Sequence, residues 1–289
     1  MAASATTAGT AFVPLPESRA RSGAPALPLD PRLFQIAALA GLLAYGLLRL
    51  DLDVRLPRAL LILATVLGTQ YACTRHLRLP AFDPRSALIS GLSLCLLLRT
   101  PYAVVAAGGA VLAVAGKFVV RIRGKHVFNP TNFALVALLL TGQAWVSPGQ
   151  WGSAATLGFF VACVGCLVVN RAARSDVTVT FLLAYGGLVF ARSLWLGEPM
   201  AIPLHRLESG ALLIFAFFMI SDPRTTPDHR AARVLFACVV ALGAAYIQFR
   251  LFRTNGLLWS LAAASPLVPV LDRLLPGARH RWPAPPLSR

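Results

Sequence analysis

Apolar and polar positions fall in long blocks along this chain, with apolar runs separated by short loops that are rich in arginine. An α-helix rises about 1.5 Å per residue, so about 20 apolar residues cross a hydrocarbon core of about 30 Å. The runs predict about ten helices, at about residues 33–48, 59–73, 86–98, 102–120, 130–141, 153–169, 177–196, 209–220, 231–249 and 257–271. The pattern therefore predicts an all-α polytopic membrane protein.

Four loops contain Asp or Asn followed by proline: Asp30-Pro31, Asp83-Pro84, Asn129-Pro130 and Asp222-Pro223. The side-chain oxygen of Asp or Asn accepts a hydrogen bond from a free N–H group at a helix start, and proline fits the first turn because its missing donor is not needed there. We expect these pairs to open the first, third, fifth and ninth helices.

The apolar runs at 130–141 and 209–220 are too short to cross a bilayer, because about 12 residues give a helix of only about 18 Å. A helix that ends inside the bilayer needs neighbours that satisfy its open backbone groups. Membrane proteins place polar sites at such ends. These two runs are therefore expected to be broken helices that frame a site.

Composition agrees with the membrane assignment, since 57% of the residues are hydrophobic, 13% are charged and the mean hydropathy is +0.68. The net charge of +16 lies in short loops beside apolar runs, as retention of positive charge in the cytoplasm requires, so we expect a lipid bilayer and no nucleic acid as the partner. The charge pattern predicts a multi-pass protein of the cytoplasmic (inner) membrane with both termini in the cytoplasm.

The chain divides into a transmembrane domain at 31–275 and two tails. Residues 1–30 are rich in Ala, Ser, Thr and Pro without an apolar core, which predicts a disordered cytoplasmic tail and no signal peptide. Residues 276–289 predict a basic cytoplasmic tail. The loop 142–151 has no charge and two tryptophans, so we expect it to lie at the outer membrane interface.

Weak internal similarity divides the domain into repeats at about 31–142 and 150–275. Thr100-Pro101 recurs as Thr226-Pro227 and Asn129 recurs as Asn255, both at an offset of 126 residues. Five helices per repeat is an odd number, so the second repeat should be inverted in the membrane. Inversion would bring the start of helix five to the end of helix eight on the cytoplasmic side. An outer counterpart would join four other polar residues: Arg99, Thr100, Thr254 and Asn255.

Several short motifs, taken in order, resemble a known family. They are Asp-Pro-Arg-Ser-Ala-Leu at 83–88, Lys117, Gly-Lys-His-Val-Phe-Asn-Pro at 124–130, Ser-Gly-Ala-Leu at 209–212 and Phe-Met-Ile-Ser-Asp-Pro at 218–223. The set is similar to the NqrB/RnfD family, the membrane subunits of sodium-translocating NADH:quinone reductase and of the Rnf complex. The nearest resemblance is to the stand-alone UnbU-type homologues of enediyne biosynthetic clusters.

This resemblance implies ten helices in inverted repeats, electron transport across the membrane, and redox proteins or other membrane subunits as partners. It also implies a non-covalent flavin, riboflavin or FMN, near the cytoplasmic Asn-Pro and Asp-Pro motifs. Members of the family carry a covalent FMN on a Thr in a Ser-Gly-Ala-Thr motif. The closest match here, Gly-Ser-Ala-Ala-Thr at 152–156, lacks the Gly of that motif and the acidic residue that normally precedes it, and Leu212 replaces the acceptor in 209–212. We therefore expect no covalent FMN.

The candidate cofactor-binding residues are the polar residues at the ends of the two short helices and in the basic loop before them: Asn129, Asn132, Asp222, Ser221, Lys117 and His126. Asn129 is either a simple helix cap or a ligand-binding residue as well. Lys117 either contacts the ligand or extends to the membrane surface. His126 would face an anionic ligand beside the start of helix five. We expect no metal site, because Cys163 and Cys166 lie within an apolar run and are interpreted as packing residues.

Two functional classes remain open. The first is a flavin-binding protein of transmembrane electron transport, such as a non-catalytic component of an oxidoreductase system that serves enediyne biosynthesis. The second is a transporter or exporter of a small molecule or ion that uses the broken-helix site. The chain has no nucleophile and base pair and no nicotinamide fingerprint, so whether it is an enzyme is left open.

Overall fold

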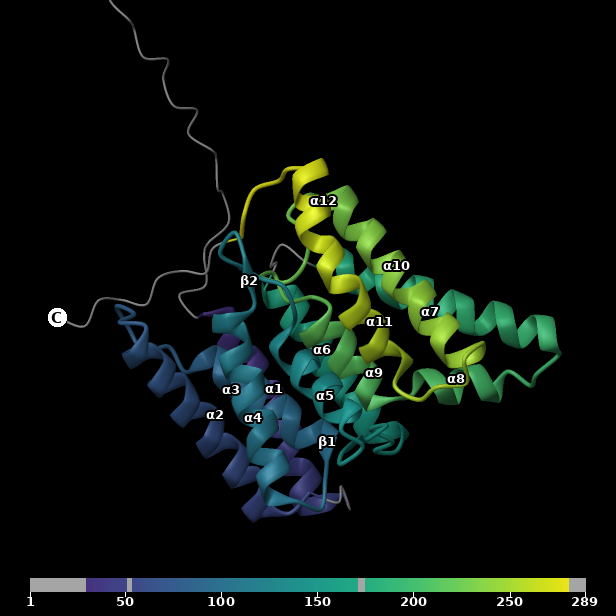
Figure 1. Ribbon diagram of the computed structural model, residues 1–289. Coiled ribbons are helices and arrows are strands. Elements are labelled where there is room, and N and C mark those ends of the chain that lie inside the picture. Colours follow the sequence, from purple (N-terminus) through teal and green to yellow (C-terminus); the bar gives the residue numbers. More distant parts are fainter. Residues whose placement is uncertain (1–29, 51–53, 171–174, 281–289) are drawn as a thin grey trace, which may run out of the picture.

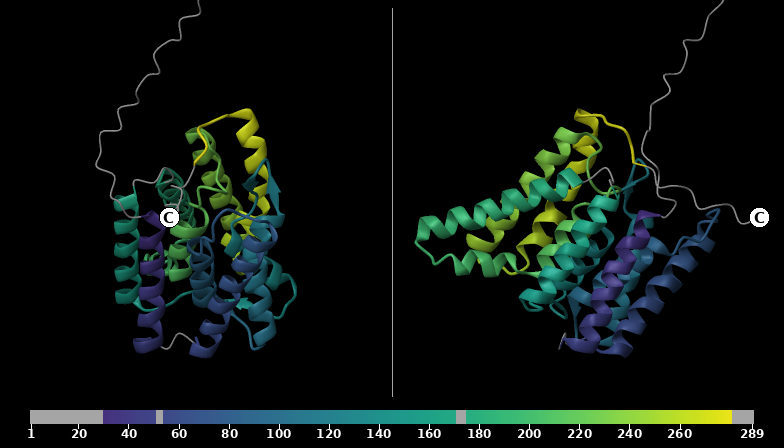
Figure 2. Two further views of the ribbon diagram at one scale, coloured as in Figure 1. Left: turned by 90° about the vertical axis from the view of Figure 1, so that its left-hand side faces the viewer. Right: turned by 180° about the vertical axis from the view of Figure 1, so that it is seen from behind.

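The computed structural model describes residues 30–50, 54–170 and 175–280, and for residue 31 and residues 165–170 the backbone alone. Apart from residue 30 and residues 276–280, the two tails expected at 1–30 and 276–289 lie outside the described residues. The described part is helical, with four two-residue strands. Its two halves lie side by side, the N-terminal half in purple and blue and the C-terminal half in green and yellow (Figures 1 and 2).

The first half contains five helices: α1 (Pro31–Arg49), α2 (Leu56–His76), α3 (Arg85–Leu97), α4 (Ala103–Val119) and α5 (Pro130–Leu140). The second half contains α6 (Ser153–Asn170), α7 (Ser175–Leu196), α8 (Ala201–Leu207), α9 (Gly210–Ile214), the π-helix η1 (Phe215–Met219), α10 (Arg230–Phe249), α11 (Gly256–Ala264), the 3₁₀ turn η2 (Ser265–Leu267) and α12 (Val268–Leu274).

The two halves use similar helix pairings. In the first half, α4 packs between α2 and α5, and α1 packs against α3. In the second half, α10 packs between α7 and α11. Contacts between α1 and α6 and between α5 and α11 join the halves. The short helices α5 and η1 therefore lie in the interior, whereas α7, α8 and α10 form an outer edge (Figure 1).

Five helices among the described residues are long and apolar enough to cross a membrane, and the bent pair of α8 with α9 and η1, at 50°, would make a sixth. The expectation of an all-α multi-pass membrane protein is met. Each of the ten predicted helices has a helical counterpart, and α8 is an additional one. The count of ten membrane spans is not confirmed, because α3, α4, α5 and the described part of α6 are shorter apolar helices.

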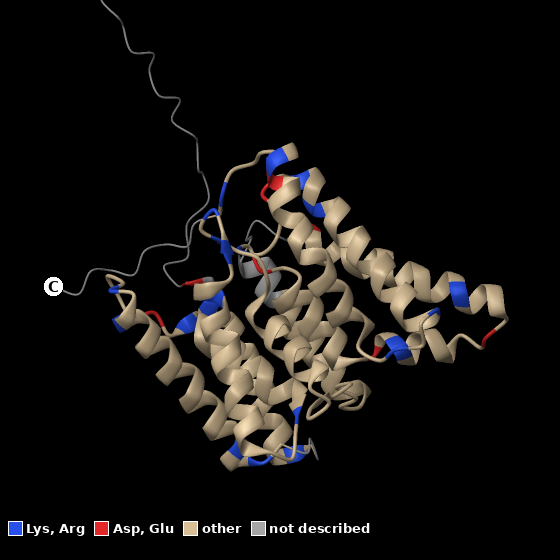
Figure 3. Cartoon of the chain, in the orientation of Figure 1, with Lys and Arg blue, Asp and Glu red and all other residues tan. Residues whose placement is uncertain are grey.

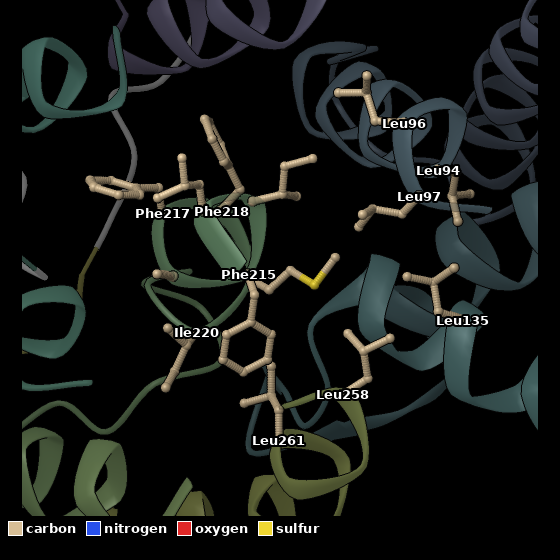
Figure 4. Close-up of a cluster of buried hydrophobic side chains, with 14 of the residues drawn as sticks. Leu94, Leu96, Leu97, Leu135, Phe215, Phe217, Phe218, Ile220, Leu258 and Leu261 are labelled. Atoms are coloured by element: carbon tan, nitrogen blue, oxygen red, sulfur yellow. The ribbon is translucent and has the colours of Figure 1, made fainter. Parts of the chain in front are cut away.

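The central core is formed where the short helices meet. Figure 4 shows Leu94 and Leu97 of α3, Leu135 of α5, Phe215 of η1 and Leu258 of α11 facing one another, each at most 5% exposed. Lipid chains are as apolar as leucine, so close packing rather than escape from solvent holds such helices together. This packing fixes the ends of α5 and η1 relative to each other.

Charged residues lie mainly at the ends of the helices, while the helix bodies are uncharged (Figure 3). At the upper end in this view, a hairpin of β2 (Arg121–Ile122) and β3 (Lys125–His126) connects α4 to the loop before α5. Arg123 and Gly124 both have positive φ, as a tight two-residue hairpin turn requires. The hairpin pairs Arg121 with His126.

Three of the four predicted Asx caps are confirmed. Asp30 accepts a hydrogen bond from the backbone N–H of Arg32 at 2.9 Å, and Asn129 accepts one from that of Asn132 at 3.1 Å. Asp83 accepts the N–H of Arg85 at 3.2 Å, one residue earlier than the assigned cap of α3.

Asp222 does not open a helix, contrary to the prediction. Its carboxylate accepts the N–H of Arg224 at 3.0 Å, and its carbonyl accepts the N–H groups of Thr225 and Thr226. These bonds close a separate turn. Helix α10 begins later, where the ring nitrogen of His229 caps it.

The two tryptophans of the loop 142–151 differ, which corrects the expectation that both lie at the membrane interface. Trp145, in β4 (Trp145–Val146), is 52% exposed and pairs with Arg99 of β1 (Leu98–Arg99). Trp151 is 4% exposed and packs edge to face on Phe159, with the ring centroids 5.6 Å apart. It is therefore a core residue.

Candidate functional site

A cavity of about 320 Å³ opens at the upper, charged end of the first half. Residues from α1, α2, α3, α4, the hairpin, the start of α5 and the turn after η1 line it. Small-molecule sites in proteins occupy about 300–1,000 Å³, so the cavity is at the lower end of that range. Its walls are both polar and apolar, and they come from helices of both halves.

Five of the six candidate residues line this cavity: Lys117, His126, Asn129, Ser221 and Asp222. They come from three separate parts of the chain, namely the end of α4, the segment leading into α5 and the end of η1. The structure therefore brings together the end of η1 and the start of α5 at one place. Their role as ligand-binding residues stays a prediction.

Asn129 is both a helix cap and part of the cavity wall. Its Oδ1 accepts the N–H of Asn132, and its Nδ2 lies 3.4 Å from the carbonyl oxygen of Phe218 and 3.5 Å from Oδ2 of Asp222. Good N–H···O bonds are about 2.9–3.0 Å long, so the amide donors are weakly engaged. They remain available to a ligand while the cap stays in place.

Asn132 is the sixth candidate, and it does not line the cavity. Its side chain is fully buried, and its Nδ2 donates to the carbonyl of Leu258 at 3.3 Å, which ties α5 to α11. Successive helix positions turn by about 100°, so the residue after Pro130 and Thr131 faces a different neighbour. Asn132 is thus a link between the halves, and its place in the cavity wall was wrongly predicted.

Lys117 does not extend to the surface. It is 5% exposed, and its Nζ donates to Oγ of Ser86 in α3 at 3.2 Å. The interpretation that this side chain reaches the interface is therefore wrong. Its ammonium lies among protein atoms at the wall of the cavity.

His126 is neutral at the wall of the cavity. Burial, together with the positive charges of Arg121, Arg224 and Lys117, lowers the pKa of its ring to about 3. A neutral imidazole has one donor and one acceptor nitrogen. Its Nδ1 is buried and has no hydrogen-bond partner among the described residues.

Gln70 of α2 is a lining residue that the sequence reasoning missed. Its side chain is 6% exposed, and its Oε1 is a second buried polar atom without a partner in the described structure. Buried polar groups are normally hydrogen-bonded, so two unpartnered atoms on one cavity indicate a polar guest. An amide within an otherwise apolar run was the available signal, because polar residues inside membrane helices are costly and mark sites.

A second missed feature is the ion-pair network beside the cavity. Arg32 contacts Asp30 and Asp83 at 2.7 Å each, and Arg85 contacts Asp30 at 2.7 Å, which ties the start of α1 to that of α3. Burial raises the pKa of Asp30, but hydrogen bonds and charge from Arg32 outweigh it and lower the pKa below its usual value. The repeated Asp-Pro-Arg at 30–32 and 83–85 was the available signal.

The expected outer counterpart does not form as predicted. A cavity of about 300 Å³ at the other end of the first half is lined by Arg99 and Thr100, together with Arg58. Thr254 and Asn255 are not among its described lining residues. The segment after α3 pairs instead with the strand β4, which keeps it away from the start of α11.

Thr156, the nearest equivalent of a covalent flavin acceptor, lies inside α6. It is 6% exposed, and its Oγ1 has no hydrogen-bond partner among the described residues. A hydroxyl in this position is shielded from a large reagent. The absence of covalent FMN remains a prediction.

Comparisons with known proteins identify relatives. Residues 139–279 match the model of the NQR2, RnfD, RnfE family. The chain is 27% identical to a subunit of the ion-translocating oxidoreductase complex of Halorhodospira halophila, over 78% of this chain and 83% of that protein.

The corresponding subunits of other bacteria match over shorter segments. Those of Klebsiella pneumoniae and Escherichia coli are 30% and 26% identical, over 46% and 52% of this chain. These matches span only 36% and 40% of the relatives' own length. The family model and the named relatives together confirm the resemblance carried by the motifs, and the chain is similar to the NQR2, RnfD, RnfE family.

Proposed function

We propose that this protein is an RnfD-type membrane subunit of an electron-transport system and that the cavity beside Asn129 and Asp222 holds a non-covalent flavin. Its relatives are named as subunits of ion-translocating oxidoreductase complexes. The observation that carries the proposal is the cavity itself. Its lining includes Asn129 and Asp222, and also Gln70 and His126, whose Oε1 and Nδ1 atoms have no hydrogen-bond partner among the described residues.

The lining residues suit the edge of a flavin ring, which presents carbonyl acceptors and an N–H donor. The amide of Asn129 donates to a ring carbonyl, and the carboxylate of Asp222 accepts from the ring N–H or from a ribityl hydroxyl. Oε1 of Gln70 accepts a further hydrogen bond. A flavin bound there supplies the capacity to take up and release electrons. The protein residues orient it and exclude water.

We further propose that the two halves are inverted repeats with the cavity on the cytoplasmic side. The matching helix pairings of α4 and α10 support the repeat, and the dense positive charge of the hairpin supports the orientation. Labelling with an impermeant thiol reagent in intact cells tests it, in a cysteine-free background. Gln143→Cys should react and Arg123→Cys should not, and the reverse pattern would refute the orientation.

Partners are expected to be other membrane subunits or redox proteins, because the relatives are subunits of complexes. The resemblance to UnbU-type homologues points to service in a natural-product pathway such as enediyne biosynthesis. Co-purification of other proteins with the native protein from its own membranes tests the proposal that it has protein partners. Isolation of the chain alone, under conditions that keep other membrane complexes intact, would contradict it.

The test of the flavin site compares flavin content among purified variants. Loss of one partner in a dry site costs about 1–3 kcal/mol, so Asn129→Leu and Asp222→Ala should each weaken flavin binding about five- to a hundred-fold. Asn129→Ser keeps a side-chain cap for α5 but has no amide, and it should weaken binding similarly. Asn255→Leu is the matched control and should bind as the parent does.

The flavin content of the parent and the variants distinguishes a flavin-binding protein from a transporter. Equal flavin content in all variants would refute this location. A parent that neither carries nor takes up flavin would refute the flavin proposal and favour a transporter or exporter. One observation supports that second candidate, namely the 50° bend between α8 and the α9–η1 segment, because broken helices line substrate sites in many transporters.

A further inference from the structure

The cavity wall carries an imbalance of charge. Four cationic side chains and two carboxylates line it within the described residues. The charge of Arg32 is compensated, because its guanidinium forms ion pairs of 2.7 Å with Asp83 and with Asp30, which does not line the cavity. Lys117, Arg121 and Arg224 then face one remaining carboxylate, that of Asp222.

Lys117 is the most informative of these cations. Its ammonium has three donors, and the described structure gives it one hydrogen-bond acceptor, the hydroxyl of Ser86. No carboxylate of the described residues forms an ion pair with it, and the side chain is 5% exposed. Burying a charge is costly unless an opposite charge or several hydrogen bonds compensate it. A ligand anion would supply that compensation.

Two other cationic side chains, those of Arg121 and Arg224, line the cavity with Lys117. Arg121 donates from Nε to the backbone carbonyl of Lys117 at 2.7 Å. Nζ of Lys117 lies 5.7 Å, and the guanidinium carbon of Arg121 5.5 Å, from the ring centroid of Phe118. The two cations are therefore held near the same ring. Arg224 enters from the turn after η1 and is exposed, so it can move toward a bound anion.

We propose that Lys117, with Arg121 and Arg224, binds a phosphate group, and that the cavity therefore selects a phosphate-bearing flavin, FMN, over riboflavin. This inference rests on the proposed flavin site. The uncharged ring lies toward Asn129 and Asp222, and the phosphate lies toward Lys117. A phosphate carries a charge of about −1.5 to −2 and forms strong charge-assisted hydrogen bonds with such cations.

The experiment is a titration of the purified flavin-free protein with FMN and with riboflavin, followed by quenching of flavin fluorescence. The parent should bind FMN at least about tenfold more tightly than riboflavin. Lys117→Gln should weaken FMN binding about 10- to 100-fold and change riboflavin binding less than about twofold. Added inorganic phosphate should compete with FMN and not with riboflavin.

Two further variants guard against loss of folding and against a general charge effect. Lys117→Arg keeps the charge and should retain the preference for FMN. Arg230→Gln removes an exposed cation at the start of α10 that does not line the cavity, and should leave both affinities unchanged. Equal affinity of the parent for the two flavins, or equal weakening of both by Lys117→Gln, would overturn the phosphate subsite and leave the flavin site standing. Failure of the parent to bind either flavin would overturn both.

Discussion

The two regions that the sequence repeat relates, around Asn129 and around Asn255, have different structures. Asn129 is in an extended conformation, with φ −60° and ψ 130°, and its side chain caps α5. Asn255 is left-handed, with φ 61° and ψ 31°, and does not cap α11 with its side chain. Asn129 lies on a cavity together with candidate residues from the other half. Recurrence of a residue type therefore does not reproduce a site, because the site depends on backbone conformation and neighbours.

The largest expected effect comes from the ion pairs that hold the charged end together. Arg32→Met removes the cation that pairs with both Asp30 and Asp83, while Arg85 stays 2.7 Å from Asp30. Loss of one partner of a buried pair costs about 3–5 kcal/mol of folding free energy, and because Arg85 compensates part of the charge we expect the lower end of this range. Arg58→Met at the opposite end removes contacts to two backbone carbonyls, of Thr100 at 3.3 Å and Pro101 at 3.1 Å, and should cost about 1 kcal/mol or less. Thermal unfolding in detergent measures the stability of both variants. Equal losses of stability would contradict the expectation that the two ends of the first half contribute differently to stability.

A smaller effect is expected at the link between the halves. Asn132→Leu leaves the buried carbonyl of Leu258 without its side-chain donor, at a cost of about 1–3 kcal/mol. Asn255→Gly changes a half-buried residue outside the core and keeps its left-handed backbone conformation accessible, so it should change stability by less than about 0.5 kcal/mol. The same unfolding assay compares them. Unchanged stability of Asn132→Leu would mean that this bond does not join the halves.

The smallest effect concerns acid sensitivity. The pKa of His126 is lowered to about 3 by burial in the folded protein, against about 6.5 for an ordinary histidine, so the unfolded chain takes up a proton first as the pH falls. The stability due to this group is present above about pH 6.5 and is lost as the pH falls toward 3. Between pH 7 and 5.5 the parent should lose about 1 kcal/mol more than His126→Gln does.

The control is His76→Gln, at the exposed end of α2. It should show the same pH dependence as the parent when unfolding midpoints are compared between pH 7 and 5.5. If His126→Gln also follows the parent, the ring of His126 takes up its proton to the same extent in the folded and the unfolded protein, and its pKa is not lowered by folding.

Much of the fold could be predicted because its elements depend on local pattern. The apolar runs gave ten helical segments, and the Asx-Pro pairs placed the starts of α1, α3 and α5. The prediction failed where contacts between distant segments determine the local structure. The carboxylate and carbonyl of Asp222 close a turn, and Trp151 is buried against Phe159. Neither fact is visible in the flanking residues.

The candidate site was also predicted correctly where local pattern determines it and wrongly where distant contacts do. The meeting of Asn129 with Asp222 could be predicted, because both lie at ends of short helices in a repeated pattern. Gln70 could not be placed at the site from its own run, since the other lining residues come from distant segments such as the β2–β3 hairpin. Asn132 was misplaced because the pattern gives the helix and not the face it presents to α11.

The most direct test of the central claim is protection of the cavity wall by bound flavin. In a background without native cysteines, Ser221→Cys places a thiol on the proposed site and Thr100→Cys places one on the cavity at the other end. Alkylation by N-ethylmaleimide is then timed with and without FMN. Bound FMN should slow alkylation of the Ser221→Cys protein at least about tenfold and leave that of the Thr100→Cys protein unchanged. Equal rates with and without FMN at Ser221→Cys, or protection confined to Thr100→Cys, would contradict the proposed flavin site.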